Sequence, residues 1–139
     1  MRPVLVDSGF IVALLDRRDR RHAECRAAME ILDCPLVTCE AVLSESCYLL
    51  RKVAGAPLAV LSNVEQGRLD LPFQLARVVP AIRAIMQKYR DIPADFADAC
   101  LIYMAEELDT GEILTLDSDF LTYRWRRNRP FELLIAPKG

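Results

Sequence analysis

The sequence predicts an α/β fold with a central, mostly parallel β-sheet, on the strength of three observations. Short apolar runs rich in β-branched residues alternate along the chain with longer segments of helical periodicity. Such an alternation of strands and helices is typical of βα units, whose strands run parallel. A hydrophobic content of 53% supplies a core, and 139 residues without repeats or Gly/Ser-rich linkers suit a single domain over residues 1–139.

The first half of the chain contains three expected strands. Residues 4–6 form a short β-branched strand, and Ser8-Gly9 makes a tight turn into an apolar helix over residues 10–15. A charged loop then precedes a helix over residues 20–32, for which Asp19 is the candidate N-cap. The other elements expected here are strands over 35–38 and 69–71 and helices over 40–53 and 56–65, the last with Pro57 in its first turn.

The second half begins with an expected helix over residues 76–90, which has Pro80 in or near its first turn. The chain then breaks at Asp91-Ile92-Pro93. Residues 95–108 form the clearest helix, because one apolar stripe runs along them. The remaining expected elements are strands over 112–116 and 131–135 and a short turn or helix over 118–123.

Charge and cysteine content exclude several classes of protein. Lys and Arg number 18 and Asp and Glu 20, a net charge of −2, which argues against a polycation that coats nucleic acid. No apolar run is long enough for a membrane helix, and Asp7 comes too early for a signal peptide. Five cysteines without a C-x-x-C pair, and His22 as the single histidine, argue against a disulfide framework or a zinc site. We therefore expect five reduced thiols and a cytoplasmic protein.

Four acidic residues interrupt apolar segments at places suited to a ligand. Asp7 and Asp117 follow strands, and the carboxyl ends of parallel strands meet at one edge of the sheet. Glu45 and Asp98 lie within apolar helical runs, where an unpaired carboxylate is costly to bury. A shared cation resolves this, and ligands that are all oxygen favour Mg²⁺ or Mn²⁺. We expect the metal to relieve carboxylate repulsion, and at least one acid to have a raised pKa without it.

Arginines flank this acidic region. Residues 91–123 hold nine acidic residues and no Lys or Arg, whereas arginines cluster after the first helix and after residue 123. An acidic centre with basic flanks suits a metal-dependent enzyme whose arginines hold the phosphates of a polyanion. On their own, arginine runs are more often solvated surface. The candidates for phosphate contact are Arg17, Arg18, Arg124, Arg126 and Arg127.

Four segments together resemble the signatures of the PIN domain family, and of its VapC-type toxins in particular. They are Val6-Asp7-Ser8-Gly9, Val42-Leu43-Ser44-Glu45, Asp95-Phe96-Ala97-Asp98-Ala99 and Leu114-Thr115-Leu116-Asp117-Ser118-Asp119-Phe120. The resemblance implies a three-layer α/β/α sandwich with a sheet of about five strands. It also implies an acidic quartet of Asp7, Glu45, Asp98 and Asp117, supported by Thr115.

The resemblance further implies a ribonuclease that hydrolyses RNA phosphodiesters with Mg²⁺ or Mn²⁺ held by the quartet. It implies the toxin of a toxin–antitoxin pair, with a small antitoxin protein as partner and a homodimer as a possible assembly. Three more residues are expected to support the site: Ser8, Asp95 as a helix N-cap, and Asp119 as a cap of the following segment or an outer ligand.

Two other function classes stay open. A PIN-like fold kept only to bind protein or RNA has no use for four acids, and an idle acidic cluster is destabilising. A receiver-type signalling domain needs a carboxylate pair near its first strand and a lysine after a late one. Here Asp7 stands alone and Asp117-Ser118-Asp119 follows the late strand. A metal-dependent nuclease assay separates these alternatives.

Overall fold

The computed structural model describes residues 2–92 and 94–137. Its centre is a five-stranded sheet in the order β3-β2-β1-β4-β7, in which every neighbouring pair is parallel. The strands are β1 (Val4–Val6), β2 (Leu36–Val37), β3 (Leu69–Asp70), β4 (Glu112–Leu114) and β7 (Glu132–Leu133). All five predicted strands are present, four of them shorter than expected.

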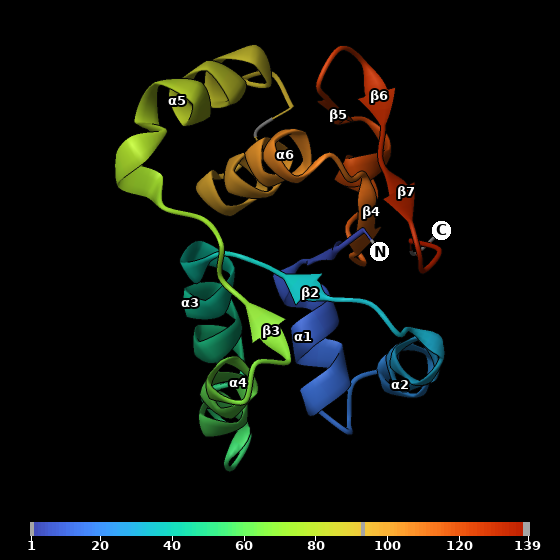
Figure 1. Ribbon diagram of the computed structural model, residues 1–139. Coiled ribbons are helices and arrows are strands. Elements are labelled where there is room, and N and C mark those ends of the chain that lie inside the picture. The colour runs from blue at the N-terminus through green and yellow to red at the C-terminus, as the bar shows by residue number, and fades with distance from the viewer. Residues whose placement is uncertain (1, 93, 138–139) are drawn as a thin grey trace.

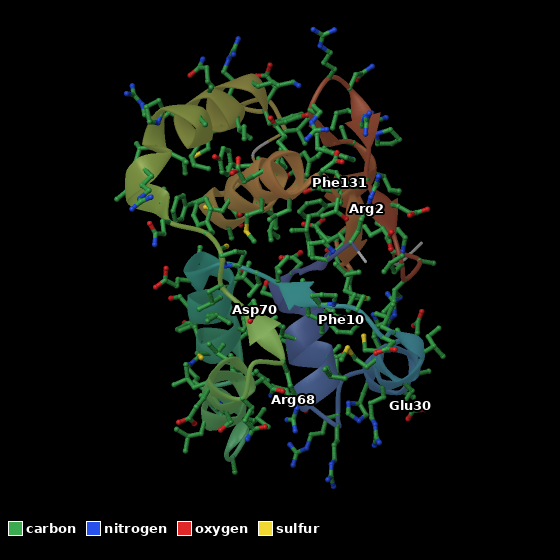
Figure 2. All side chains as sticks on the ribbon, in the orientation of Figure 1. Arg2, Phe10, Glu30, Arg68, Asp70 and Phe131 are labelled. Carbon is green, nitrogen blue, oxygen red and sulfur yellow. The ribbon has the colours of Figure 1, made fainter. Side chains whose placement is uncertain are left out.

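Helices cover both faces of the sheet, so the predicted three-layer sandwich is confirmed. Figure 1 shows α1 and α2 on one side of the sheet and α5 and α6 on the other. Phe10 of α1 is buried between its helix and the sheet (Figure 2). The helices are α1 (Ser8–Leu15), α2 (His22–Ile31), α3 (Glu40–Leu49), α4 (Ala56–Glu65), α5 (Val79–Lys88) and α6 (Phe96–Leu108), with the 3₁₀ turns η1 (Leu75–Arg77) and η2 (Ser118–Leu121).

Three helix starts differ from the prediction. The expected turn at Ser8-Gly9 is wrong, because the Asp7 carboxylate caps the chain and α1 begins at Ser8. Asp19 does not cap α2, because its carboxylate accepts a hydrogen bond from Arg21 in the loop before the helix. The helix expected over 76–90 is divided into η1 and α5, with Pro80 in the first turn of α5. Of the expected break at 91–93, residue 93 lies outside the described residues.

A two-stranded antiparallel hairpin was not predicted. It pairs β5 (Arg124–Trp125) with β6 (Arg129–Pro130), and Arg126 and Asn128 have positive φ angles of 49° and 93° in its turn. The segment is rich in arginine and too short for an alternating apolar pattern, so only the arginine run was visible in the sequence.

Two composition-based expectations can be compared with the structure. All five cysteines are free thiols, as predicted. None of the helices in the described part of the chain has both the length and the apolar character that crossing a bilayer demands.

Candidate metal centre

Three carboxylates meet at the carboxyl edge of the sheet. Asp7 follows β1, Asp117 follows β4, and Asp98 lies at the start of α6. One oxygen from each lies within 4.8 Å of the others. The predicted closeness of Asp7 and Asp117 is therefore confirmed. The chain builds β2 and β3 on one side of β1 and returns to place β4 on the other, so the cluster lies where the strand order reverses, the usual ligand position in such sheets.

Each acid of this cluster belongs to the beginning of a helix. Asp7 is the N-cap of α1, and its Oδ1 accepts a hydrogen bond of 2.8 Å from the next backbone N–H. Asp117 caps η2 in the same way through the N–H two residues on, at 2.9 Å. Asp98 lies in the first turn of α6. Helix N-termini stabilise negative charge, which partly offsets the repulsion among the three carboxylates.

Thr115 links two of the acids. Its hydroxyl is buried and donates a hydrogen bond of 2.7 Å to Oδ2 of Asp7. The hydroxyl oxygen of Thr115 in turn accepts a hydrogen bond of 3.1 Å from the backbone N–H of Asp117. This is possible because β4 ends at Leu114, two residues earlier than predicted, so that the chain turns into the site at Thr115.

The partner of Asp98 could not be predicted from the sequence. The buried hydroxyl of Tyr123 donates a hydrogen bond of 3.0 Å to its Oδ2. The tyrosine ring makes edge-on contacts with Tyr89 and Phe120, whose ring centres lie 5.1 and 5.0 Å away. An apolar segment before an arginine run suggests a buried aromatic side chain, but not which distant carboxylate its hydroxyl meets.

Burial shifts the ionisation of the cluster. It raises the pKa of Asp7 to about 6, against the opposing hydrogen bonds from Thr115 and Ser8. It raises the pKa of Asp98 to about 7, with the neighbouring charges of Asp95 and Asp7 as further causes. The predicted raised pKa is confirmed, but its largest cause is burial and not carboxylate repulsion. Burial and the charge of Asp98 also raise the pKa of Tyr123, which therefore stays a hydrogen-bond donor.

Glu45 reaches the site from α3 by a different route. It lines a pocket of about 270 Å³ together with the three clustered acids, and its Oε1 accepts a hydrogen bond of 2.6 Å from the Ser8 hydroxyl. It lies outside the cluster of oxygens within 4.8 Å. Glu45 is exposed toward the pocket, whereas Val42 and Leu43 on the same helix are buried in the core.

Asp95 and Asp119 have different roles from each other. Asp95 is the N-cap of α6, as predicted, and its Oδ1 accepts a hydrogen bond of 2.8 Å from the N–H of Asp98. It also lines the pocket. Asp119 does not cap η2, because Asp117 already does so. Its side chain is exposed beyond the cluster.

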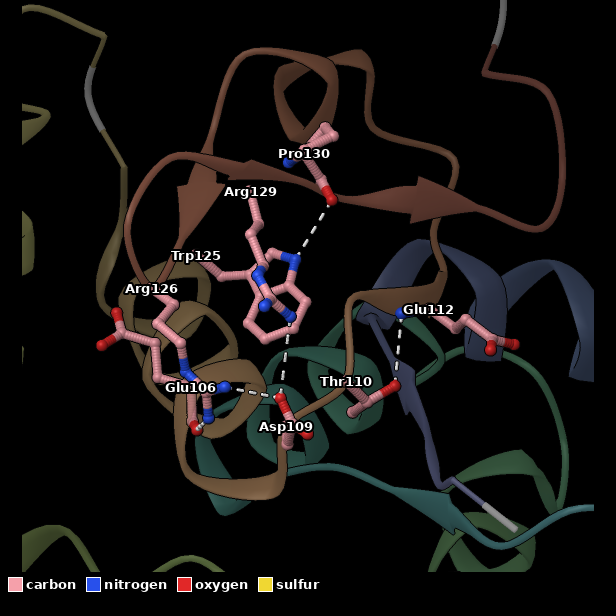
Figure 3. Close-up of polar contacts among 8 residues, drawn as sticks. All are labelled: Glu106, Asp109, Thr110, Glu112, Trp125, Arg126, Arg129 and Pro130. Carbon is pink, nitrogen blue, oxygen red and sulfur yellow. Dashed lines mark hydrogen bonds and ion pairs between the residues drawn. The ribbon is translucent and has the colours of Figure 1, made fainter.

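The predicted phosphate-binding arginines do not surround the acids. Figure 3 shows Arg126 bonded to Asp109 and to the carbonyl of Glu106, beyond the end of α6. That end lies about 16 Å along the helix from Asp98. Arg124 donates to three carbonyls of its own loop. The remaining candidates are exposed and lie after α1 or in the hairpin turn: Arg17, Arg18 and Arg127.

Comparison with known proteins identifies the family. The model of the PIN domain matches residues 4–125, which is most of the chain. The chain belongs to the PIN domain family. The predicted resemblance to PIN domains is thereby confirmed, and the receiver-type alternative is set aside.

Two VapC proteins are similar to this chain. Ribonuclease VapC26 of Mycobacterium tuberculosis is 29% identical over 116 residues, which cover 82% of this chain and 86% of VapC26. The crystal structure of Mycobacterium tuberculosis VapC20, a toxin that cleaves the sarcin–ricin loop, matches with a TM-score of 0.80. That match covers 91% of this chain and 99% of VapC20 at 20% identity, and it supports the PIN fold alone.

Proposed function

We propose that this PIN domain is a metal-dependent endoribonuclease that hydrolyses RNA phosphodiesters. The observation that carries the proposal is the cluster of Asp7, Asp98 and Asp117, with oxygens within 4.8 Å of one another at the ligand edge of the sheet. The similarity to a protein named as a ribonuclease, VapC26, supports the choice of RNA.

The donor set fits a hard divalent cation. All three clustered ligands are carboxylate oxygens, which suit Mg²⁺ or Mn²⁺ better than zinc. Burial has raised the pKa of Asp7 and of Asp98, and a cation at this position compensates the buried charge. Glu45 faces the same pocket and contributes the fourth carboxylate, directly or through water. The chemistry that such an ion supplies is acidification of a water molecule and stabilisation of charge on the phosphate.

The surrounding residues orient these ligands. Thr115 and the N-terminus of α1 fix both oxygens of Asp7, while each oxygen keeps a lone pair for a cation. Tyr123 fixes Asp98 in the same way. The Ser8 hydroxyl donates to Glu45 and has no histidine beside it, since His22 bonds to the carbonyl of Ala13. The site therefore favours hydrolysis by water over a serine nucleophile.

The proposal includes a biological setting. We infer that the chain is the toxin of a toxin–antitoxin pair, that a small antitoxin protein binds it, and that it acts in the cytoplasm. Its likeness to VapC-type proteins supports this inference. The exposed apolar side chains of Leu58 and Leu61 on α4, 71% and 54% exposed, offer surface for such a partner or for a second copy in a homodimer.

A nuclease assay on the purified protein tests the activity. We expect cleavage of RNA with Mg²⁺ or Mn²⁺ and none with a chelator. Asp7→Asn should abolish cleavage and keep the fold, because asparagine also caps helices well. Glu40→Gln is the matched control, since Glu40 is exposed in the first turn of α3 and outside the pocket. Metal-dependent cleavage by Asp7→Asn at the wild-type rate would contradict the role of Asp7, and no cleavage by the wild-type protein would leave a non-catalytic binding module.

A further inference from the structure

Helices α1 and α3 pack side by side and connect the acidic pocket with a second cavity. At one end, Ser8 at the start of α1 donates its hydroxyl hydrogen bond to Glu45 of α3. At the other end, residues that follow α1 and residues that follow α3 line a common cavity of about 840 Å³. The two helices therefore run in the same direction, and the seam between them leads from the acids to this cavity.

The second cavity is cationic. Arg17 and Arg18 enter it from the loop after α1 and Lys52 from the loop after α3, with Asp16 as its single acid. The Asp16 carboxylate already accepts a hydrogen bond of 3.0 Å from the backbone N–H of Arg18. Within the described ranges, none of the three cations forms an ion pair within 4.0 Å. Figure 2 shows nitrogen-tipped side chains extending from this end of the molecule.

The walls of the seam follow from helical spacing. Residues four and seven positions apart share a helix face. By this spacing Ser8, Val12 and Leu15 share a face of α1 and Glu45 and Leu49 share a face of α3, with Lys52 in the turn that follows. The first member of each series lines the acidic pocket and the last lines the cationic cavity. A ligand lying along the seam therefore touches both.

An exposed aromatic ring lies beside the seam. Tyr48, three residues after Glu45, is 62% exposed. The guanidinium of Arg51 stacks 4.0 Å from the centre of its ring and donates a hydrogen bond of 2.8 Å to the Tyr48 carbonyl. The arginine therefore covers one face of a ring that is still largely exposed. Exposed aromatic rings next to cationic grooves are how proteins hold the bases of single-stranded nucleic acids.

We propose that the seam between α1 and α3 binds single-stranded RNA. Backbone phosphates bind to Arg17, Arg18 and Lys52, and a base stacks on Tyr48. The strand then continues to the acidic pocket with its scissile phosphate. The proposal rests on the proposed ribonuclease function for the choice of RNA as the polyanion.

The opposite charges at the two ends fit this ligand. At the cationic end the protein's own side chains meet the phosphates, so binding there needs no metal. At the acidic end a phosphate is repelled unless a cation intervenes. An acidic protein segment would satisfy the cations but has no base to stack on Tyr48.

The affinity for RNA without metal tests the proposal. The measurement is fluorescence anisotropy of a labelled, mixed-sequence RNA strand of about 12 nucleotides, a length typical of such sites. The protein carries Asp117→Asn and a chelator is present, so that nothing is cleaved. Joint substitution of Arg17, Arg18 and Lys52 by Glu should weaken binding about tenfold or more and lower the salt slope by about 2. Joint substitution of the exposed Arg77, Arg83 and Arg90 by Glu is the charge-matched control and should change affinity far less.

Substitutions of Tyr48 test the proposed base stacking, which does not depend on the charge of the site. Tyr48→Ala should weaken binding roughly tenfold, and Tyr48→Phe should retain it, because stacking needs the ring and not the hydroxyl. Equal losses in the control triple variant, or unchanged affinity in Tyr48→Ala, would overturn the proposal. So would a polyglutamate peptide that competes as well as RNA. A Tyr48→Ala variant with a changed molar mass in sedimentation and unchanged RNA affinity would assign the face to a second copy instead.

Different results would contradict the proposed ribonuclease function and the proposed RNA-binding seam. If the wild-type chain cleaves RNA and the seam variants bind and cleave it equally well, the proposed RNA-binding seam is wrong and the proposed ribonuclease function is unaffected. The wild-type chain could instead cleave no RNA but bind it without metal, with the seam variants losing that binding. The RNA-binding seam is then supported and the proposed hydrolysis is wrong.

Discussion

The hydroxyl of Tyr123 holds Oδ2 of Asp98 at 3.0 Å from within a buried cluster of aromatic rings. The donor lies in the loop after η2 and the acceptor at the start of α6, so the bond ties two separate parts of the chain at the site. It also favours the ionised form of Asp98, in opposition to burial.

Tyr123→Phe should therefore weaken Mn²⁺ binding and reduce RNA cleavage while the fold is kept. The ring and its edge-on contacts remain, and the lost hydrogen bond should cost about 1 kcal/mol of stability. Without the donor the pKa of Asp98 rises further, so the variant should need a higher pH for full metal affinity. Calorimetric Mn²⁺ titrations at several pH values measure this. Tyr103→Phe is the matched control, because the Tyr103 hydroxyl donates its hydrogen bond to Glu107 of the same helix, outside the acidic pocket. Equal Mn²⁺ affinity in both variants would remove the positioning role.

The metal-free protein should lose stability as the pH rises from about 4 to about 7. The pKa values of Asp7 and Asp98 in the folded chain, about 6 and about 7, exceed the value of 3.8 for a free carboxyl group. In this window the folded state binds more protons than the unfolded state, so the free energy of unfolding falls with increasing pH. Mn²⁺ should restore stability at pH 7 and have little effect at pH 4. Thermal melting with a chelator and with Mn²⁺ measures both, and a curve that stays flat over this window would contradict the raised pKa values.

Asp95→Ala should separate helix capping from metal binding. Loss of the N-cap of α6 should cost about 1 kcal/mol of stability. The variant should keep part of its cleavage activity, because Asp95 lies outside the three-oxygen cluster. Asp98→Asn should show the reverse, with a stable fold and no activity. Denaturant unfolding and RNA cleavage on both variants decide the point, and an active Asp98→Asn protein would reject Asp98 as a ligand.

Thr115→Val should disturb the site more than its small change in shape suggests. The substitution leaves Oδ2 of the buried Asp7 without a partner, which should cost about 1–3 kcal/mol of stability. The hydroxyl lowers the pKa of Asp7, so its removal should raise that pKa above about 6. Thr115→Ser keeps the hydroxyl and should recover both stability and metal affinity. If the serine variant behaves like the valine variant, the hydroxyl is not responsible.

The sequence predicted which helices and strands are present better than the residues at which they begin and end. The carboxyl-edge rule was enough to bring Asp7 and Asp117 together, because strand order in a parallel sheet leaves few alternatives. Glu45 was assigned to the site because a carboxylate in an apolar run needs a partner, but the run itself did not show that this side of the helix is exposed or that Ser8 is the partner. Tyr123 was missed because hydrogen bonds between distant segments leave no periodic trace. The sequence also could not show that the guanidiniums of Arg124 and Arg126 bind carbonyls or a carboxylate of the chain itself, and their contact with phosphate stays a prediction.

The placement of the acids at helix starts has a genetic consequence. Asp7 and Asp117 begin a helix and a 3₁₀ turn as well as lining the pocket. Asparagine is as good an N-cap as aspartate but lacks its charge. Because aspartate and asparagine codons differ by a single base, one point mutation at either position should abolish the proposed activity and leave a folded chain. Loss-of-function alleles of this gene should therefore include asparagine at these codons without loss of protein abundance, whereas alanine at the same codons should lower the level of the protein.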